Sequence, residues 1–368
     1  MNRLVIASAG SGKTNLIVKS AVDDAKAGKR VLITTFTEAC EHEIRSKIIQ
    51  LNGCVPAKVD IITWFSFLIR HGVRPFQGCL FDFDTKGMLL VSGRSGLKFQ
   101  GEMFPVYWGE ENFVKFYFAE DKRIYSDKLA QLVVRLQVAS KGLVFERISR
   151  CYEKIYIDEV QDLAGYDLEV LNLLFKIDSD VLLVGDPRQA TYATNNSRKN
   201  KKYVKSAIVN FFLDERLGID IDDTSLQVNH RCAPAICDYS NKLFPFMNPA
   251  ASGNLDVTGH DGVFLVVKEK LGQYLESFQP VQLRDSIKTE TDSNYKSMNF
   301  GKSKGLTLDR VLIYPSAPMV KWMCNNDAEL TQAARSKFYV ALTRAKNSVG
   351  IVVSKTEVKK ITDLDVYE

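Results

Sequence analysis

Eight residues near the amino terminus restrict the possible folds of this chain more than any other stretch. Residues 7–14 have the sequence ASAGSGKT and directly follow the apolar run 4–6. Glycine at positions 10 and 12 lets the backbone adopt positive φ, so successive amides can point at an anion beside the positive end of a helix. The sequence therefore predicts a strand, a phosphate-binding loop and a helix, in this order. The predicted nucleotide-binding residues of the loop are Ser8, Ala9, Gly10, Ser11, Gly12, Lys13 and Thr14.

Two side chains of this loop and two acids far downstream are the groups that phosphoryl transfer requires. Lys13 is expected to reach the β- and γ-phosphates of a nucleotide, and the Thr14 hydroxyl to bind Mg²⁺. The apolar run 155–157 delivers Asp158 and Glu159 at its end, where parallel sheets place their ligands. Asp158 is predicted to hold Mg²⁺ through water, and Glu159 to orient and deprotonate the attacking water. The alternative is an ordinary acid pair at the surface.

The composition agrees with a large globular enzyme inside the cell. The chain has 368 residues, of which 45% are hydrophobic, enough for two or three domains. Its seven cysteines contain no CxxC pair and its four histidines lack ligand spacing, so we predict free thiols and neither zinc nor an iron–sulfur cluster. No run approaches the length of a membrane span, and no leader precedes the first strand. These features predict a cytoplasmic protein that does not enter a membrane.

One stretch is strongly basic although the net charge of the chain is only +5. Residues 198–205 have the sequence RKNKKYVK. Such a run is typical of a solvated loop, and it is also typical of a segment that follows phosphates, in which case binding would weaken with salt. The sequence leaves both interpretations open.

From residue 4 to about residue 352, the order of further motifs resembles the UvrD/Rep family of superfamily 1A DNA helicases. Each later motif is short, but together they follow the order of the family. The matching stretches are Thr35-Phe36-Thr37 (motif Ia), Thr63-Trp64-Phe65-Ser66-Phe67 (motif Ib), Asp158–Asp162 (motif II), Val184–Gln189 with Tyr192 behind it (motif III), Asn229–Cys232 (motif IV), Ser303–Leu306 (motif V) and Tyr339–Ala345 (motif VI).

The resemblance implies an ATP site, with Mg²⁺, that is completed by a second domain. A transferring γ-phosphate needs cations from both sides of a cleft, and Arg231 and Arg344 match the arginines that the family supplies. Gln189 matches the γ-phosphate sensor, and Gly305 is assigned to nucleotide binding. The predicted catalytic residues are Lys13, Asp158, Glu159, Gln189, Arg231 and Arg344; the predicted metal ligands are Thr14 and Asp158.

The family holds single-stranded DNA on aromatic rings above a positive groove. The residues that the resemblance assigns to DNA are Thr35, Phe36, Thr63, Trp64 and Tyr192. Departures from the family pattern weaken this assignment, because Thr194 stands where an aromatic residue usually follows Tyr192. A place in the hydrophobic core is an equal alternative for Trp64.

The chain alternates short β-branched runs with helical stretches, which predicts an α/β fold with parallel sheets. We expect two RecA-like P-loop NTPase domains, at residues 1–212 and 213–368, with a helical insertion at about 76–145. Strands are predicted at 4–7, 31–34, 59–62, 154–158 and 180–184, and then at 263–267, 281–283, 311–313 and 349–353. Only residues 233–302 separate motifs IV and V, so the large helical subdomain of the family is predicted to be missing.

These features favour a DNA helicase or translocase that hydrolyses ATP and moves 3′ to 5′ on single-stranded DNA. The alternative is a DNA-stimulated ATPase subunit that senses DNA or regulates a partner nuclease, as in short UvrD-like proteins of Gabija-type phage-defence systems. A non-catalytic DNA-binding scaffold is disfavoured because the ATP-site residues occur together. No fused nuclease domain is expected after Arg344, so a nuclease would be a separate subunit.

Overall fold

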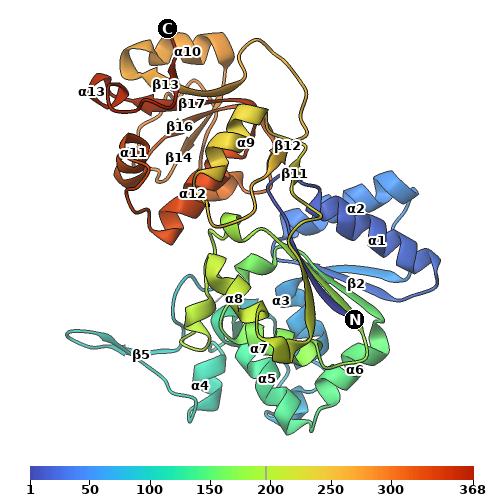
Figure 1. Ribbon diagram of the computed structural model, residues 1–368. Helices are drawn as coiled ribbons and strands as arrows, with labels where there is room; N and C mark the ends of the chain where they lie inside the picture. Colours follow the sequence, from blue (N-terminus) through green and yellow to red (C-terminus); the bar gives the residue numbers. More distant parts are fainter. Residues whose placement is uncertain (195–196) are drawn as a thin grey trace. The chain divides into compact units, whose positions relative to one another are not determined.

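The computed structural model describes residues 1–194 and 197–368 (Figure 1). They form two compact units, each with its own sheet. The first consists of Met1–Val5, Thr14–Gly185 and Ala193–Asp222; the second consists of Ile6–Lys13, Asp186–Tyr192 and Asp223–Glu368. The predicted α/β fold with two parallel-sheet domains is confirmed, whereas the boundary at residue 212 stays a prediction.

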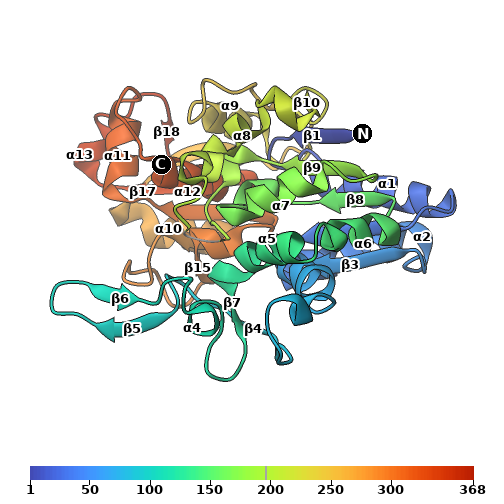
Figure 2. The same cartoon turned by 90° about the horizontal axis from the view of Figure 1, so that it is seen from below.

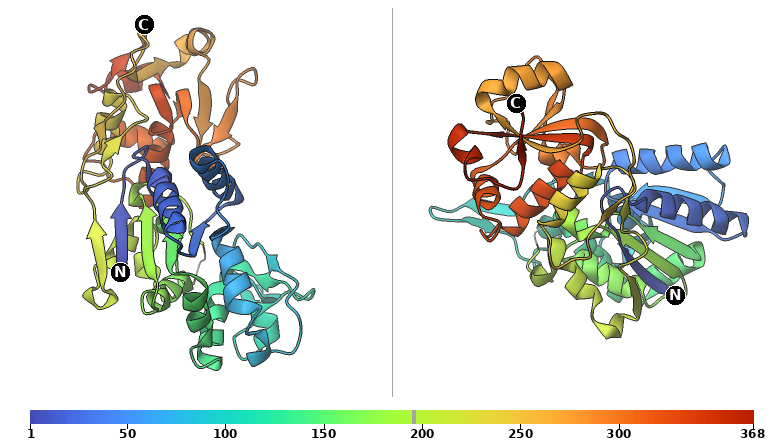
Figure 3. Two further views of the ribbon diagram at one scale, coloured as in Figure 1. Left: turned by 90° about the vertical axis from the view of Figure 1, so that its right-hand side faces the viewer. Right: turned by 45° about the horizontal axis from the view of Figure 1, so that its top comes forward.

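The first unit is built on a sheet with the strand order β10-β1-β9-β8-β2-β3. Its strands are β1 (Asn2–Ile6), β2 (Val31–Thr35), β3 (Val59–Thr63), β8 (Lys154–Ile157), β9 (Asp180–Gly185) and β10 (Ile219–Asp222). All five residues of β2 are buried, as expected for a parallel strand covered on both faces. β10, β1 and β9 lie side by side in Figure 3 (left). The strands predicted for this sheet are therefore confirmed, with ends that differ by a residue or two.

Helices cover both faces of this sheet. α1 (Lys13–Lys26) and α2 (Glu38–Asn52) lie on one face, and α5 (Leu129–Ala139), α6 (Leu143–Cys151) and α7 (Tyr166–Leu174) on the other (Figure 1). This distribution follows from right-handed crossovers, because the chain runs outward from β1 to β3 and then returns through β8 and β9 to β10. Two single-turn helices complete the unit, α3 (Trp64–Phe67) and α8 (Val209–Phe212).

The helical insertion predicted at 76–145 is not confirmed. Its first part contains the short strands β4 (Met88–Leu89), β5 (Leu97–Gln100), β6 (Pro105–Tyr107) and β7 (Ile124–Tyr125), with only α4 (Phe113–Tyr117) between them. Gly96 has φ +73° and starts an exposed hairpin of β5 and β6, which projects from the unit in Figure 2. Glycines at 96 and 101 and the proline at 105 break any helical run. Helix α5 does follow the predicted apolar stripe, and Leu129, Leu132, Val133 and Leu136 are buried.

The second unit has a parallel sheet with the order β15-β14-β16-β17-β13-β18. Its strands are β13 (Gly262–Val267), β14 (Val281–Arg284), β15 (Ser297–Asn299), β16 (Leu308–Tyr314), β17 (Ala345–Val353) and β18 (Asp365–Val366). A separate parallel pair is formed by β11 (Val228–Asn229) and β12 (Ala251–Ser252). The helices are α9 (Pro234–Asn241), α10 (Leu271–Phe278), α11 (Ala317–Cys324), α12 (Gln332–Leu342) and α13 (Lys355–Val358).

The interval between motifs IV and V contains few elements of secondary structure. All residues from 233 to 302 are described, and they contain only α9, β12, β13, α10, β14, β15 and short 3₁₀ turns. Within this interval the structure therefore has no large helical subdomain, in agreement with the prediction.

Candidate nucleotide site

The predicted phosphate loop follows β1 and ends where α1 begins at Lys13. Gly10 has φ +68° and Gly12 has φ +89°, the left-handed conformation that glycine adopts without strain. A Cβ at Gly12 would meet nothing within 4 Å, so this position needs glycine for its backbone conformation alone. A Cβ at Gly10 would also stand 2.9 Å from the Cβ of Arg231 and collide with the side chain of Asn229. The loop thus has the backbone that its sequence predicts.

Hydrogen bonds from the backbone and from one side chain hold the loop against residues 226–230. The Ser8 amide donates to the Leu226 carbonyl at 2.9 Å, and the His230 amide donates to the Gly10 carbonyl at 3.0 Å. The Gln227 side-chain amide donates to the Ile6 carbonyl at 3.0 Å. These bonds explain why residues 6–13 belong to the second unit, although β1 belongs to the sheet of the first.

The two predicted acids follow β8 in the first unit. The Asp158 side chain is 6% exposed and its Oδ1 accepts from the Glu159 amide at 2.9 Å. Glu159 is left-handed, with φ 56° and ψ 39°, and its carboxylate accepts a bond from the Gln161 amide. A non-glycine residue in this region stores about 1–3 kcal/mol of backbone strain and often marks a functional position. The strand end therefore turns sharply at the residue expected to orient water.

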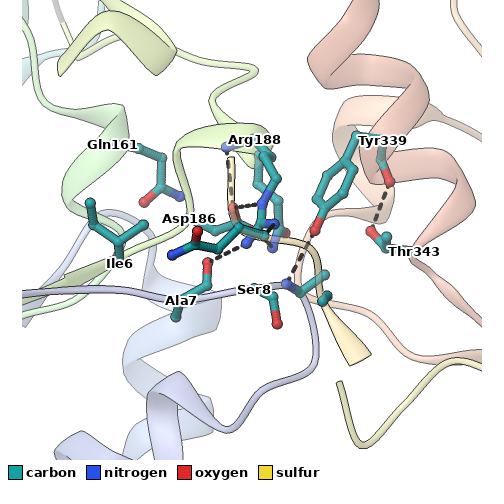
Figure 4. A network of polar contacts seen from close by, with 12 residues as sticks. Ile6, Ala7, Ser8, Gln161, Asp186, Arg188, Tyr339 and Thr343 are labelled. Atoms are coloured by element: carbon teal, nitrogen blue, oxygen red, sulfur yellow. Dashed lines mark hydrogen bonds and ion pairs between the residues drawn. The ribbon is translucent and has the colours of Figure 1, made fainter. Parts of the chain in front are cut away.

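Arg188 is a buried cation for which the sequence suggested no role. It lies in a 3₁₀ turn after β9, where its Nε donates to Asp186 Oδ1 at 2.9 Å and its Nη2 to the Ala7 carbonyl at 3.1 Å (Figure 4). Its guanidinium also lies 5.5 Å from the ring centre of Tyr339. Burial by itself lowers the pKa of Arg188, but the adjacent Asp186 carboxylate outweighs it and the pKa is raised overall. Arg188 therefore stays positively charged, and its hydrogen bonds join the phosphate loop to motif III.

Gln189 and Arg344, both predicted as catalytic, are in direct contact. Arg344 Nη2 donates to Gln189 Oε1 at 3.0 Å, and Gln189 Nε2 donates to Asp186 Oδ2 at 2.7 Å. Arg344 Nη1 donates to the Leu306 carbonyl at 3.3 Å, and the residue is only 1% exposed. Gly305, with φ +86°, makes the turn that presents this carbonyl. Gln189, the predicted γ-phosphate sensor, and Arg344 are thus joined by a direct hydrogen bond.

Arg231 is positioned by a turn that the sequence did not reveal. Asn229 is buried, and its Oδ1 accepts from the amides of Arg231 at 2.8 Å and Cys232 at 3.0 Å. Arg231 Nη1 donates to the Thr343 carbonyl at 3.1 Å, directly beside Arg344. Asn229 was part of a recognised motif, but its role depends on hydrogen bonds that spacing alone does not show.

Tyr339 of motif VI reaches the phosphate loop. Its hydroxyl lies 3.4 Å from the Ala9 amide, next to Ser8 in Figure 4. The side chain is 1% exposed, and burial raises its pKa, with the nearby Arg188 opposing the shift. Tyr339 therefore remains a neutral hydroxyl and can serve as a hydrogen-bond partner of the loop.

The residues present fit the phosphates of a nucleotide and Mg²⁺. The loop combines two left-handed glycines with a buried Ser8 hydroxyl that has no hydrogen-bond partner among the described residues. The Thr14 hydroxyl and the Asp158 carboxylate are oxygen donors of the kind that Mg²⁺ prefers. The structure places loop residues 8–13, Gln189, Arg231, Gly305 and Arg344 in the second unit, and Thr14, Asp158 and Glu159 in the first.

Most of the residues assigned to DNA lie in the first unit and differ in exposure. Thr35 is buried, Phe36 is half-buried in an edge-to-face contact with Phe65, and Thr63 caps α3 by accepting from the Ser66 amide. None of these contacts by itself requires DNA. Their assignment stays a prediction.

Trp64 needs correction as a stacking platform. It is 1% exposed, its ring packs on Phe67, and its Nε1 donates to Asp167 Oδ1 at 2.7 Å. Neither face of the indole is open to a base, because the ring forms part of the core under α7. Sequence could not decide this, since an aromatic residue after a strand suits the core and a DNA platform equally well.

We expect Trp64→Phe to lower the free energy of unfolding by about 1–3 kcal/mol, because the variant leaves Asp167 without the indole donor. Urea denaturation would measure the loss. The affinity of the folded variant for single-stranded DNA should equal that of the parent. Unchanged stability together with weaker DNA binding would restore Trp64 as a DNA contact.

Tyr192 differs from Trp64 because 44% of its surface is exposed. Its ring rests on the backbone of Gly301, where an added Cβ would stand 3.2 Å from Tyr192 Cζ. Glycine at 301 therefore leaves room for the Tyr192 ring. The assignment of Tyr192 to DNA stays a prediction.

The described residues contain neither a metal-binding cluster of His, Cys, Asp and Glu side chains nor a helix that could span a membrane. No group of three or more His, Cys, Asp or Glu side chains within them could hold a metal ion. None of their helices combines the length and apolarity needed to cross a membrane.

Comparison with known families identifies the fold. Residues 1–195 match a family model described as an AAA domain, and residues 144–353 match the viral superfamily 1 RNA helicase core domain. The chain belongs to the superfamily 1 helicases. Superfamily 1 helicases use ATP, and the contacts among the phosphate loop, Gln189 and Arg344 agree with this membership.

Individual relatives are more distant. The helicase is 26% identical to Gabija protein GajB of Bacillus cereus (strain VD045) over 256 residues, which are 65% of this chain and 46% of GajB. It is 46% identical over 50 residues to an ATP-dependent helicase/nuclease subunit of Enterococcus faecalis (strain ATCC 700802 / V583), covering 13% of this chain and 4% of that protein. A solved arterivirus nonstructural protein 10 (helicase) with DNA has a TM-score of 0.45 and 15% identity, covering 98% of this chain and 63% of that one. The chain thus spans less than two thirds of the relatives it matches.

Proposed function

We propose that this superfamily 1 helicase hydrolyses ATP to move 3′ to 5′ along single-stranded DNA, as UvrD-type enzymes do. The observation that carries the proposal is the continuous network from the phosphate loop to motif VI. Arg188 bonds the Ala7 carbonyl and Asp186, Asp186 accepts from Gln189, and Gln189 accepts from Arg344. A change in charge at the loop would reach Arg344 through direct bonds.

Each side chain has a distinct task in this proposal. ATP with Mg²⁺, when bound, supplies the phosphoryl group and the divalent charge. Lys13 would neutralise the phosphates, Thr14 and Asp158 would hold the metal, and Glu159 would orient and deprotonate a water. Gln189 aims Arg344, and Arg344 with Arg231 stabilises the charge that develops as the γ-phosphate leaves.

Transfer of this energy to DNA would use Tyr192. It follows Gln189 by three residues, and the hydroxyl end of its exposed ring lies beside Gly301, two residues before motif V. A base stacked on this ring would therefore be linked to the γ-phosphate sensor by a short, buried turn. The direction of movement rests on the resemblance to UvrD and Rep.

A second candidate is a DNA-stimulated ATPase subunit that senses DNA or regulates a partner nuclease. Two observations favour it: the similarity to a Gabija protein, and the match to a protein named as a helicase/nuclease subunit. The interval 233–302 also lacks, among its described residues, the helical subdomain with which UvrD-type helicases hold a duplex.

Strand displacement separates the two candidates. We expect the purified protein to unwind a 3′-tailed duplex of about two helical turns (roughly 20 base pairs) weakly, and a 5′-tailed duplex not at all. The missing subdomain predicts little activity on much longer duplexes. Robust unwinding of long duplexes would favour an autonomous helicase. ATP turnover stimulated by DNA without any unwinding would favour the subunit, and preference for the 5′ tail would contradict the proposed polarity.

A further inference from the structure

The first unit contains a cavity of about 370 Å³ that the nucleotide site does not use. Its walls come from the insertion, the start of α7 and residues 197–199. The residues that matter for its chemistry are Arg94, Phe116, Lys128, Tyr166, Arg198 and Lys199. A volume in this range can hold a small ligand or one unit of a polymer.

The cavity is strongly positive. Four cationic side chains line it, against the single carboxylate of Asp127. Both oxygens of this carboxylate already accept bonds from Ser95, one from its amide and one from its hydroxyl. Lys128 is the innermost cation, with a side chain 12% exposed and an ammonium 3.5 Å from Asp127 Oδ2. Lys199 also pairs with Glu169 at 3.5 Å, but Arg94 and Arg198 still give the lining an excess of positive charge, which favours an anionic ligand.

Aromatic rings alternate with these cations. Lys128 Nζ lies 4.4 Å from the ring centre of Phe116, and the half-buried Tyr166 also lines the cavity. Further along the insertion, Lys98 and Lys115 flank the ring of Trp108 at 4.7 and 4.3 Å. Cations beside aromatic rings are the combination that binds single-stranded nucleic acid.

The basic stretch 198–205 bears on whether the ligand is a free anion or a polymer. Arg198 and Lys199 line the cavity, while Lys201 and Lys202 continue the same segment and are exposed. A free anion would need only the cavity. A strand with successive phosphates would use both the cavity and the segment that leaves it, which favours a polymer.

We propose that this cavity, which we call the insertion cavity, is a second binding site for single-stranded DNA, separate from Tyr192. The phosphates lie against Arg94, Arg198 and Lys199, and a base packs on Tyr166. The choice of DNA rests on the proposed function. The insertion cavity would hold the strand on the first unit independently of contacts made by the second.

The test compares two double variants of equal charge change. Arg94→Gln with Arg198→Gln removes two cations from the insertion cavity. Lys29→Gln with Lys176→Gln removes two exposed lysines that precede β2 and β9 of the same unit and do not line the cavity. Fluorescence anisotropy with a labelled oligothymidylate measures affinity against salt. We expect at least tenfold weaker binding for the first pair and a salt slope smaller by about 1.4, since each phosphate contact in single strands contributes about 0.7. The control pair should match the parent.

A third variant tests the ring. Tyr166→Leu keeps an apolar side chain and should weaken binding about fivefold or more if a base stacks there. Thermal unfolding of every variant checks that the unit is folded. Lys128 is left unchanged in this experiment because its burial makes it a poor choice for substitution.

The outcomes distinguish this inference from the proposed function. If the parent binds oligothymidylate but all cavity variants match the control pair, the second site is wrong and the proposed function stands. If thymidine monophosphate displaces the oligonucleotide at equal nucleotide concentration, the cavity takes a free nucleotide and the strand assignment is wrong. If the parent neither binds oligothymidylate nor hydrolyses ATP faster in its presence, both proposals fail.

Discussion

Glu159→Gln is expected to lower ATP turnover by about 10²- to 10⁴-fold while ATP binding persists, because the variant keeps the shape of the side chain but cannot accept a proton from water. Lys13→Ala should abolish turnover and weaken binding as well, since it removes the counter-charge of the phosphates. Steady-state phosphate release and the binding of a fluorescent ATP analogue would measure the two effects separately.

A matched control residue lies at the other end of β8. Glu153 stands just before β8, at the opposite end from Glu159, and its carboxylate pairs with Arg30 at the surface. Glu153→Gln should therefore leave turnover unchanged. Substantial turnover by Glu159→Gln, at a level close to that of Glu153→Gln, would remove Glu159 from the catalytic set.

Arg344→Ala is expected to lower turnover by about 10³-fold or more, as for an arginine that acts on the transition state. The affinity for ATP should stay within about tenfold, because the interaction forms mainly as the γ-phosphate leaves. Arg231→Ala should act in the same direction. Arg335→Ala is the control, since Arg335 lies on the preceding helix α12, where it donates to the Leu330 carbonyl at 3.5 Å and lies 5.8 Å from the ring centres of Phe244 and Phe246.

The contact between Arg344 and Gln189 makes a further result measurable. If Gln189 aims Arg344, the double variant with alanine at both positions should be about as slow as Arg344→Ala alone. Fully additive losses would mean that the two side chains act independently. Equal turnover of Arg344→Ala and Arg335→Ala would contradict the role of Arg344 altogether.

Local patterns were sufficient for much of the fold. Most strands of both sheets follow apolar runs, and a parallel sheet buries such runs on both faces, as β2 illustrates. The short or alternating strands β10, β15 and β18 do not, and they were not predicted. The phosphate loop was also predictable, because the glycines at 10 and 12 are required by a backbone conformation that depends on neighbouring residues only.

Features that depend on distant partners were not predictable in the same way. Trp64 is a core residue because Asp167 accepts its N–H, and nothing near Trp64 in the sequence signals this bond. Arg188 owes its position to the Ala7 carbonyl, 181 residues away. The insertion was misjudged for another reason: β4 to β7 are very short, so neither the helical nor the strand period is repeated often enough to be detected.

The central claim is that the phosphate loop, Gln189 and Arg344 form one ATPase that responds to DNA. Its most direct test is the steady-state rate of ATP hydrolysis by the purified parent, with and without saturating single-stranded DNA, beside Arg344→Ala under the same conditions. We predict a low basal rate, a clear increase on addition of DNA, and neither in the variant. A parent whose hydrolysis is unaffected by DNA, or a variant that keeps the stimulated rate, would contradict the claim.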